Sequence, residues 1–170
     1  KRLMGGYAIV GGQLPLATGA GLAIVRKGEK DVVVCQMGDA TTNIGAFHES
    51  LNLAALWKLP VVYAVVNNGF GMGTSVAAGS AVAELYKKAC AYGIPGVEVD
   101  GNDVVATRDA TREAVERARK DRIPSLLDIK SFRLKGHSVV DPDRYRPEDY
   151  LRRIRGQDPV SRLADQLRDE

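Results

Sequence analysis

The sequence is poor in the residues that build disulfide scaffolds, metal clusters and membrane spans. Its 170 residues include two cysteines and two histidines. Cys35 and Cys90 show no metal-ligand spacing and are too few for a disulfide framework, so we predict reduced core thiols and a cytoplasmic protein. The longest apolar runs are far shorter than the roughly 20 residues that span a bilayer. The first four residues, Lys1-Arg2-Leu3-Met4, do not lead into the apolar core of a signal peptide.

A strong charge of one sign is also missing. The chain has 24 Lys and Arg against 21 Asp and Glu, a net charge of +3, and the two signs are interleaved. We therefore expect neither a nucleic acid nor a membrane as partner. The length and the 45% hydrophobic content are sufficient for one domain with a real core. Because the chain lacks an initiator Met and enters a glycine-rich segment at once, we expect an excised or incomplete chain.

What the sequence does contain is a regular alternation of apolar runs and segments with helical periodicity. This alternation predicts an α/β fold, a doubly wound and mostly parallel sheet with helices on both faces. We predict an α/β domain over residues 1–150 and a helical tail of an incomplete chain over 151–170. Helices are expected at 11–27, 45–58, 81–92, from Asn102 or Asp103 to about 122, and at 159–169. Strands are expected at 32–37, 61–66, 97–100 and 125–132, with a glycine-rich loop at 67–80.

Polar residues follow the first two predicted strands. Gly38-Asp39 ends the first and Asn67-Asn68 ends the second, and Asn68 follows Asp39 by 29 positions. This separation suits one strand–helix–strand unit, whose parallel strands end at the same edge of the sheet, where α/β folds bind ligands. Carboxylate and amide oxygens suit Mg²⁺ bound with a phosphate group. Either half alone also fits a helix cap or a surface turn, so the pair carries the prediction.

The two histidines have different expected roles. His48 lies inside the first crossover helix, where we predict a structural role. His137 follows the last strand, close to Arg133, and so falls on the same sheet edge as the Asp and Asn. There it could bind a diphosphate or donate to a reacting carbonyl group, although an exposed loop histidine is the alternative.

Longer sequence motifs around these residues resemble those of one family. Gly38-Asp39 and Asn67-Asn68 across one helix are similar to the binding motif of thiamine-diphosphate enzymes. The ordered series from Gly5 to Tyr145 resembles the alpha subunit of the decarboxylating component of the pyruvate dehydrogenase complex. That series includes Asn52-Leu53-Ala54-Ala55-Leu56-Trp57-Lys58-Leu59-Pro60, Gly71-Met72-Gly73-Thr74-Ser75, Gly136-His137-Ser138 and Asp141-Pro142.

The resemblance implies a thiamine-diphosphate-binding fold and assigns roles to residues. It implies that Asp39 and Asn68 ligate Mg²⁺ through their side chains and that Phe70 does so through its carbonyl. Gly38, Ala40 and Thr41 would line the diphosphate, and His137 and Arg133 would be the catalytic residues of the entrance loop, with His137 also near the diphosphate. The backbone that holds the aminopyrimidine ring would be that of Ala8, Ile9 and Val10. Ser75 and Ser138 match positions that are phosphorylated in some relatives.

Two departures from the family pattern bear on these roles. Ala40 stands where the motif usually has Gly. The additional methyl group is tolerated at this position only if φ is negative. Lys135 replaces a His that is common in pyruvate-specific relatives, which puts a proton-shuttling role there in doubt. Alpha subunits of the family are also longer than this chain.

The resemblance further implies that the enzyme decarboxylates pyruvate and passes the acetyl group to a lipoyl-bearing acyltransferase. A beta subunit, in an expected α₂β₂ assembly, would supply the carboxylate that activates the cofactor, so we expect this chain to be inactive alone. Branched-chain 2-oxo acids or acetoin are alternative substrates, and a non-catalytic assembly module is an alternative function. Thr18-Gly19-Ala20-Gly21 suggests a nucleotide-binding oxidoreductase instead, but these glycines follow no strand, as that motif requires.

Overall fold

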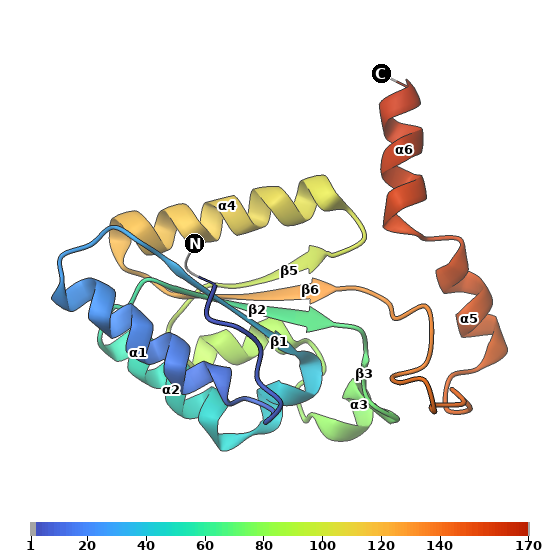
Figure 1. Cartoon of the computed structure of the whole chain (residues 1–170), viewed down its shortest axis with the longest axis horizontal. Coiled ribbons are helices and arrows are strands. Elements are labelled where there is room, and N and C mark those ends of the chain that lie inside the picture. The colour runs from blue at the N-terminus through green and yellow to red at the C-terminus, as the bar shows by residue number, and fades with distance from the viewer. Residues whose placement is uncertain (1–2, 170) are drawn as a thin grey trace.

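A four-stranded parallel sheet forms the centre of the part of the chain that the computed structural model describes, residues 3–169 (Figure 1). Its strands are β1 (Val33–Gly38), β2 (Val61–Asn67), β5 (Gly96–Asp100) and β6 (Ser125–Lys130). They lie in the order β1-β2-β6-β5, and every neighbouring pair is parallel. All four strands therefore end at one edge of the sheet, and the prediction of a parallel α/β fold is confirmed.

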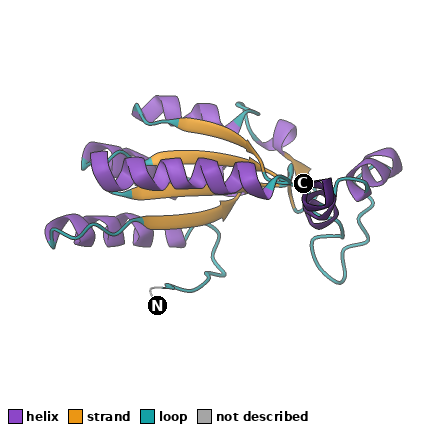
Figure 2. Ribbon diagram, turned by 90° about the horizontal axis from the view of Figure 1, so that it is seen from above, coloured by secondary structure: helices purple, strands orange, loops and turns teal. Residues whose placement is uncertain are grey.

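Helices cover both faces of this sheet (Figure 2). On one face lie α1 (Gln13–Arg26), α2 (Gly45–Leu56) and the 3₁₀ helix η2 (Leu85–Tyr92); on the other lies α4 (Val104–Asp121). Short elements gather at the carboxyl edge: η1 (Asp39–Asn43), the hairpin β3 (Phe70–Gly71) with β4 (Thr74–Ser75), and α3 (Val76–Gly79). The chain continues through α5 (Glu148–Arg155) and α6 (Pro159–Asp169).

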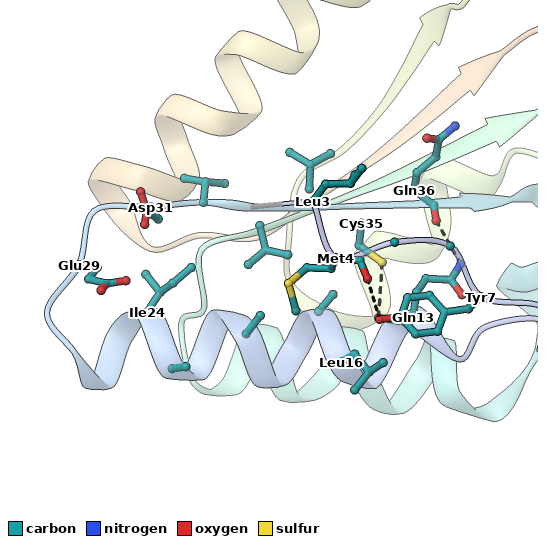
Figure 3. A pocket seen from close by; sticks show the side chains of 18 of the residues that line it. Leu3, Met4, Tyr7, Gln13, Leu16, Ile24, Glu29, Asp31, Cys35 and Gln36 are labelled. Carbon is teal, nitrogen blue, oxygen red and sulfur yellow. Dashed lines mark hydrogen bonds between the residues drawn. The ribbon is translucent and has the colours of Figure 1, made fainter. Parts of the chain in front are cut away.

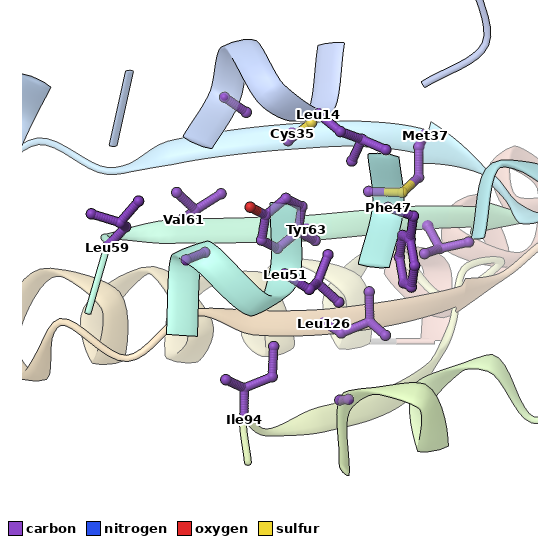
Figure 4. Close-up of a cluster of buried hydrophobic side chains, with 14 of the residues drawn as sticks. Leu14, Cys35, Met37, Phe47, Leu51, Leu59, Val61, Tyr63, Ile94 and Leu126 are labelled. Carbon is purple, nitrogen blue, oxygen red and sulfur yellow. The ribbon is translucent and has the colours of Figure 1, made fainter. Parts of the chain in front are cut away.

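The alternation of side chains along β2 divides the core into two parts. Tyr63 and its neighbours at odd positions point toward α1 and α2, in a cluster that includes the buried Phe47 and Leu51 (Figure 4). Val62 points the other way and packs with Ala114 and Ala118 of α4. Because both faces of β2 are covered, the strand is a continuous apolar run, as buried parallel strands are.

Strand β1 departs from this expectation. Its burial alternates, and Val34 is 53% exposed because α4 packs over β2, β5 and β6. The opposite face of β1 borders a groove against α1, which residues 3–7 also line; Leu3, Met4, Leu16 and Ile24 contribute apolar side chains to it (Figure 3). Helices therefore cover both faces of the sheet, as predicted, but leave one face of β1 partly exposed.

The boundaries of the helices and strands agree with the sequence predictions at some positions and differ at others. Asp103 caps α4 by accepting a hydrogen bond from the Ala106 N–H at 2.9 Å, as predicted. The helix predicted at 81–92 is a 3₁₀ helix that begins only at Leu85, and the last strand ends at Lys130 rather than 132. Helix α5 was not predicted. Cys35 is buried as expected, but Cys90 is exposed, so the prediction of a core thiol is wrong there.

Among residues 3–169, the structure has no helix with both the length and the apolar character to cross a bilayer. The cytoplasmic location stays a prediction.

Candidate functional site

Asp39 lies directly after β1, at the first position of η1, and only 3% of its surface is exposed. Burial raises the pKa of its carboxyl above the usual value, while hydrogen bonds from the backbone amides of Asp39 and Asn68 and the charge of Arg133 act in the opposite direction. The hydrogen bond from Asn68 shows that the ends of β1 and β2 do bring this pair together. Asp39 is therefore a buried carboxyl group whose ionised form is less favourable than that of an exposed Asp.

The chain after β2 turns tightly around two asparagine side chains. The Asn67 Oδ1 accepts the Gly69 N–H at 3.0 Å, and the Asn68 Oδ1 accepts the Phe70 N–H at 3.2 Å. Gly69 has φ +83°, a conformation that L side chains rarely adopt. The turn leads into the β3–β4 hairpin, and an amide oxygen retains a second lone pair for another partner.

Helix η1 accommodates Ala40 without strain. Ala40 lies in a 3₁₀ turn and is not among the residues with positive φ, so the condition for tolerating a methyl group is met. Its Cβ packs directly on Gly71, where an added Cβ would lie only 2.5 Å away. Glycine at position 71 therefore leaves room for the Ala40 methyl group. Thr41 is buried beside Ala40, whereas Gly38 is extended and exposed.

Lys88 of η2 holds the end of η1 in place. Its ammonium donates to the Thr42 carbonyl at 3.1 Å, to the Thr42 Oγ1 at 2.9 Å and to the Asn43 Oδ1 at 2.8 Å. Burial lowers the pKa of Lys88. The role of this residue was not predicted, because 45 residues separate it from its partner Asn43.

The loop after β6 brings Arg133 and His137 to the same edge. Arg133 donates to the His137 Nδ1 at 3.1 Å, to the Met72 carbonyl at 3.3 Å and to the Tyr145 hydroxyl at 2.9 Å. The positive charge of Arg133 acts to lower the pKa of Asp39. Because the His137 Nδ1 accepts, its proton is on Nε2, and its ring is exposed.

Two residues to which the sequence analysis assigned no role fix this loop. The Asp141 carboxylate accepts the His137 N–H at 2.6 Å, the Tyr145 hydroxyl at 2.7 Å and the Asp143 N–H at 2.9 Å, which lowers its pKa to about 2. Arg146, only 4% exposed, pairs with Asp143 and donates to loop carbonyls, including that of Lys135 at 2.8 Å. Local composition gives no signal for either role, because the segment reads only as polar and turn-rich.

The remaining predicted residues lie at the rim. Ala8, Ile9 and Val10 are exposed, and the chain turns there with the Gly12 N–H donating to the Ile9 carbonyl at 3.0 Å. The next residue, Gly11, packs against Ile44 just after η1, which places the segment beside the same sheet edge. No described contact joins residues 8–10 to Asp39. His48 lies elsewhere, 2.5 Å from the Tyr92 hydroxyl.

The donor set of this edge consists of hard oxygens. Within residues 3–169 there is no cluster of three or more His, Cys, Asp or Glu that could hold a metal. A cation beside Asp39 would instead combine one carboxylate with the amide oxygen of Asn68 and backbone carbonyls, leaving positions for water and phosphate oxygens. Mg²⁺ prefers this arrangement, so the residues present fit a magnesium–diphosphate group.

The fold has a solved relative. The chain aligns with the X-ray structure of a candidate thiamin diphosphate-dependent enzyme from Mycobacterium smegmatis with a TM-score of 0.56 and 20% identity, over 71% of this chain and 22% of that one. The parallel sheet with its covering helices is thus the α/β fold of thiamine-diphosphate-binding proteins.

Sequence comparison gives the family. The model of the family "Dehydrogenase E1 component" matches residues 1–170, and the chain belongs to this family. It is 42% identical to a pyruvate dehydrogenase E1 component subunit alpha of Rhizobium meliloti, over 100% of this chain and 49% of that protein. The protein of the same name from Porphyra purpurea is 40% identical over 98% of this chain and 50% of its own length. The chain thus spans about half the length of these curated relatives.

Proposed function

We propose that this chain holds the diphosphate and Mg²⁺ of thiamine diphosphate in the alpha subunit of a 2-oxo acid dehydrogenase. The observation that carries the proposal is the convergence of the buried Asp39 carboxylate and Asn68 at the ends of two adjacent parallel strands. A buried carboxylate is costly unless a positive partner compensates it. A divalent cation bridging to phosphate oxygens is such a partner.

Each predicted site residue has a defined task in this proposal. The side chains of Asp39 and Asn68 and the carbonyl of Phe70 ligate Mg²⁺. The diphosphate lies along Gly38, Ala40 and Thr41, whose small side chains permit close approach, with His137 nearby; Ala8, Ile9 and Val10 hold the aminopyrimidine through their backbone. When bound, the cofactor supplies the nucleophilic carbon that 2-oxo acid decarboxylation requires.

Arg133 and His137 are the proposed catalytic pair of the entrance. The Arg133 guanidinium donates to the His137 Nδ1 at 3.1 Å, so the N–H of the ring is on Nε2. That N–H is free to donate to a phosphate or substrate oxygen. Arg133 also places a positive charge near Asp39, where anionic groups are expected to bind.

The proposed partner is a beta subunit that supplies the activating carboxylate, in an α₂β₂ heterotetramer. Exposed apolar side chains at the rim of the site support an interface there: Ile9 is 80% exposed and Val10 63%. A lipoyl-bearing acyltransferase is the proposed acceptor of the acyl group. Without the beta subunit, we expect the chain to be inactive.

Pyruvate is the proposed substrate, supported by the Gly71–Ser75 motif and by the names of the relatives. Branched-chain 2-oxo acids and acetoin are the alternatives within this chemistry. Decarboxylation rates of the reconstituted complex with pyruvate and with 3-methyl-2-oxobutanoate discriminate among the 2-oxo acids. A faster rate with the branched acid would reject pyruvate.

Calorimetry on the chain co-purified with its beta subunit tests the cofactor site. We expect thiamine diphosphate to bind only when Mg²⁺ is present, and Asp39→Ala to abolish that binding because it removes the only charged ligand in the proposed set. Asp109→Ala, a solvent-facing change on α4, is the matched control and should bind as the wild type does. Equal binding by Asp39→Ala and wild type would contradict the proposal, and so would activity of the chain without a partner.

A further inference from the structure

Strand β6 carries a carboxylate that the proposed site does not use. Asp128 is fully buried and follows Leu126 and Leu127 in an otherwise apolar stretch. Burying a charge on a central strand costs free energy unless the charge is paired and hydrogen-bonded. Its partners therefore indicate what the residue does.

Each oxygen of Asp128 faces a different group. Its Oδ1 accepts a hydrogen bond from the Asn67 Nδ2 at 2.8 Å. Its Oδ2 lies 2.8 Å from the Lys130 ammonium, close enough to attract the charge but not oriented for a hydrogen bond. Lys130 also lies 3.5 Å from a Glu98 carboxylate oxygen, so it is shared between two acids. The directed contact of Asp128 is therefore the one with Asn67.

Asn67 passes this constraint to the turn at the end of β2. It is 4% exposed, and while its Nδ2 donates to Asp128, its Oδ1 accepts the Gly69 N–H at 3.0 Å. Its backbone carbonyl accepts the Ser131 N–H at 2.8 Å. The side chain can thus neither rotate nor flip its amide without losing a buried hydrogen bond. Asn68, the predicted cation ligand, lies between the two residues held in this way.

We propose that Asp128 is a positioning residue for the cation site: through Asn67 and the Gly69 N–H it fixes the turn that presents Asn68 and Phe70. The inference rests on the proposed function, since it needs a cation at Asp39. Asp128 itself contacts Asn67 and Lys130 and is not a member of the proposed ligand set. Groups that orient metal ligands typically contribute 10- to 100-fold in metal affinity.

The charge of Asp128 acts in the same direction as its hydrogen bond. Besides burial, the negative charge of Asp128 contributes to the raised pKa of Asp39. Two carboxylates that repel each other across a poorly solvated space attract a divalent cation more strongly than one does. Asp128 thus both orients the turn and increases the negative potential at the site.

Four variants separate the hydrogen bond from the charge. Asp128→Leu removes both, whereas Asp128→Asn keeps an acceptor for Asn67 and removes only the charge. Asn67→Asp places two acceptors face to face. The double variant Asn67→Asp with Asp128→Asn exchanges the two groups, so that the new amide donates to the new carboxylate, which still accepts the Gly69 N–H.

The experiment measures Mg²⁺-dependent binding of thiamine diphosphate to each variant assembled with its beta subunit. We expect Asp128→Leu and Asn67→Asp to weaken binding by about 10- to 100-fold, Asp128→Asn by less, and the exchanged pair to return to within about threefold of wild type. Without cofactor, backbone hydrogen exchange at Gly69 should be faster in Asp128→Leu by more than its loss of global stability in urea accounts for. Glu98→Gln, which removes the other acid beside Lys130, is the control and should bind normally.

The outcomes distinguish this inference from the proposed function. If wild type binds the cofactor but Asp128→Leu binds it within twofold of wild type, the positioning role is wrong and the proposed function stands. The same conclusion follows if the exchanged pair binds as weakly as Asn67→Asp alone. If wild type itself shows no Mg²⁺-dependent binding, the proposed function fails and this inference fails with it.

Discussion

At the scale of single residues, the buried polar side chains concentrate where strands end. Asp39, Asn67 and Asp128 are each less than 5% exposed, although they belong to residue types that rarely enter a core without partners. Asn67 and Asp128 bind each other, and the Asp128 Oδ2 accepts no hydrogen bond but lies 2.8 Å from the Lys130 ammonium. Asp39 is hydrogen-bonded by backbone amides, which leave its negative charge in place. This residual charge of Asp39 is a physical indication of a cation site.

The two cysteines differ in their burial. Burial raises the pKa of Cys35 to about 11, while Cys90 is exposed on η2. Because the thiolate is the reactive form, we predict that a disulfide reagent at pH 8 modifies Cys90 in the native protein and modifies Cys35 only after unfolding. Absorbance of the released thiol counts the reactive groups.

Cys90→Ser is the matched control for this thiol count. It should leave no reactive thiol in the native state and one after denaturation. Two rapidly reacting thiols in the native wild type would show that the α1–β1 contact over Cys35 opens in solution.

At the scale of elements, helix α1 packs closely because one of its glycines faces the sheet. A Cβ at Gly21 would lie 2.8 Å from the Val61 Cγ2 and 3.3 Å from the Leu59 Cβ, whereas one at Gly19 would meet nothing within 4 Å. The two positions are two residues apart and lie on different sides of the helix. The motif that suggested nucleotide binding is therefore explained by helix–sheet packing.

These two glycines predict opposite effects of the same substitution. Gly21→Ala should lower the free energy of unfolding by about 1–2 kcal/mol, because overpacking exceeds the gain in helix propensity. Gly19→Ala should raise it by about 0.5–1 kcal/mol, since only the propensity term acts. Urea denaturation followed by fluorescence of the single Trp57 measures both, and a destabilised Gly19→Ala would contradict the packing.

Helices and strands were predictable from the sequence where they have a clear helical periodicity or a continuous apolar run. The periodicity of α1, α2 and α4 and the apolar runs of β2 and β6 predict these elements without reference to any tertiary contact. Helix α5 escaped prediction because its sequence, Glu-Asp-Tyr-Leu-Arg-Arg-Ile-Arg, is mostly charged. It is held by packing of the buried Ile154 and by contact of Tyr150 with Phe70 at a ring separation of 6.0 Å. The late start of η2 likewise has no local cause in the sequence.

At the scale of the whole molecule, the carboxyl edge of the sheet collects segments that are far apart in the chain. The loop after β6 joins this edge through Arg133, which contacts the β3–β4 hairpin at Met72, and Asp141 holds the loop in shape. The dependence of the melting temperature on pH should therefore show whether the Asp141 carboxylate holds this loop in shape.

Because hydrogen bonds lower the folded-state pKa of Asp141 to about 2, below the usual value for Asp, its ionised form stabilises the folded state. That contribution is complete above about pH 4 and is lost as the pH falls through 2. We predict that Asp141→Asn has a lower melting temperature than wild type at pH 7, and that the difference shrinks between pH 4 and pH 2. A difference that stayed constant to pH 2 would contradict this role of the carboxylate.

The sequence by itself determined the class of fold and the two strand ends that meet at one sheet edge, and it singled out Asp39 and Asn68 as the centre of the proposed site. These features depend on local sequence, namely on hydrophobic periodicity and on short sequence motifs at the ends of strands. Only the tertiary structure decided what supports them: Asp128 behind Asn67, Lys88 at the end of η1, and Gly71 against the Ala40 methyl group. Such partners lie on other elements, and contacts between distant segments depend on how the chain packs, which no local pattern specifies.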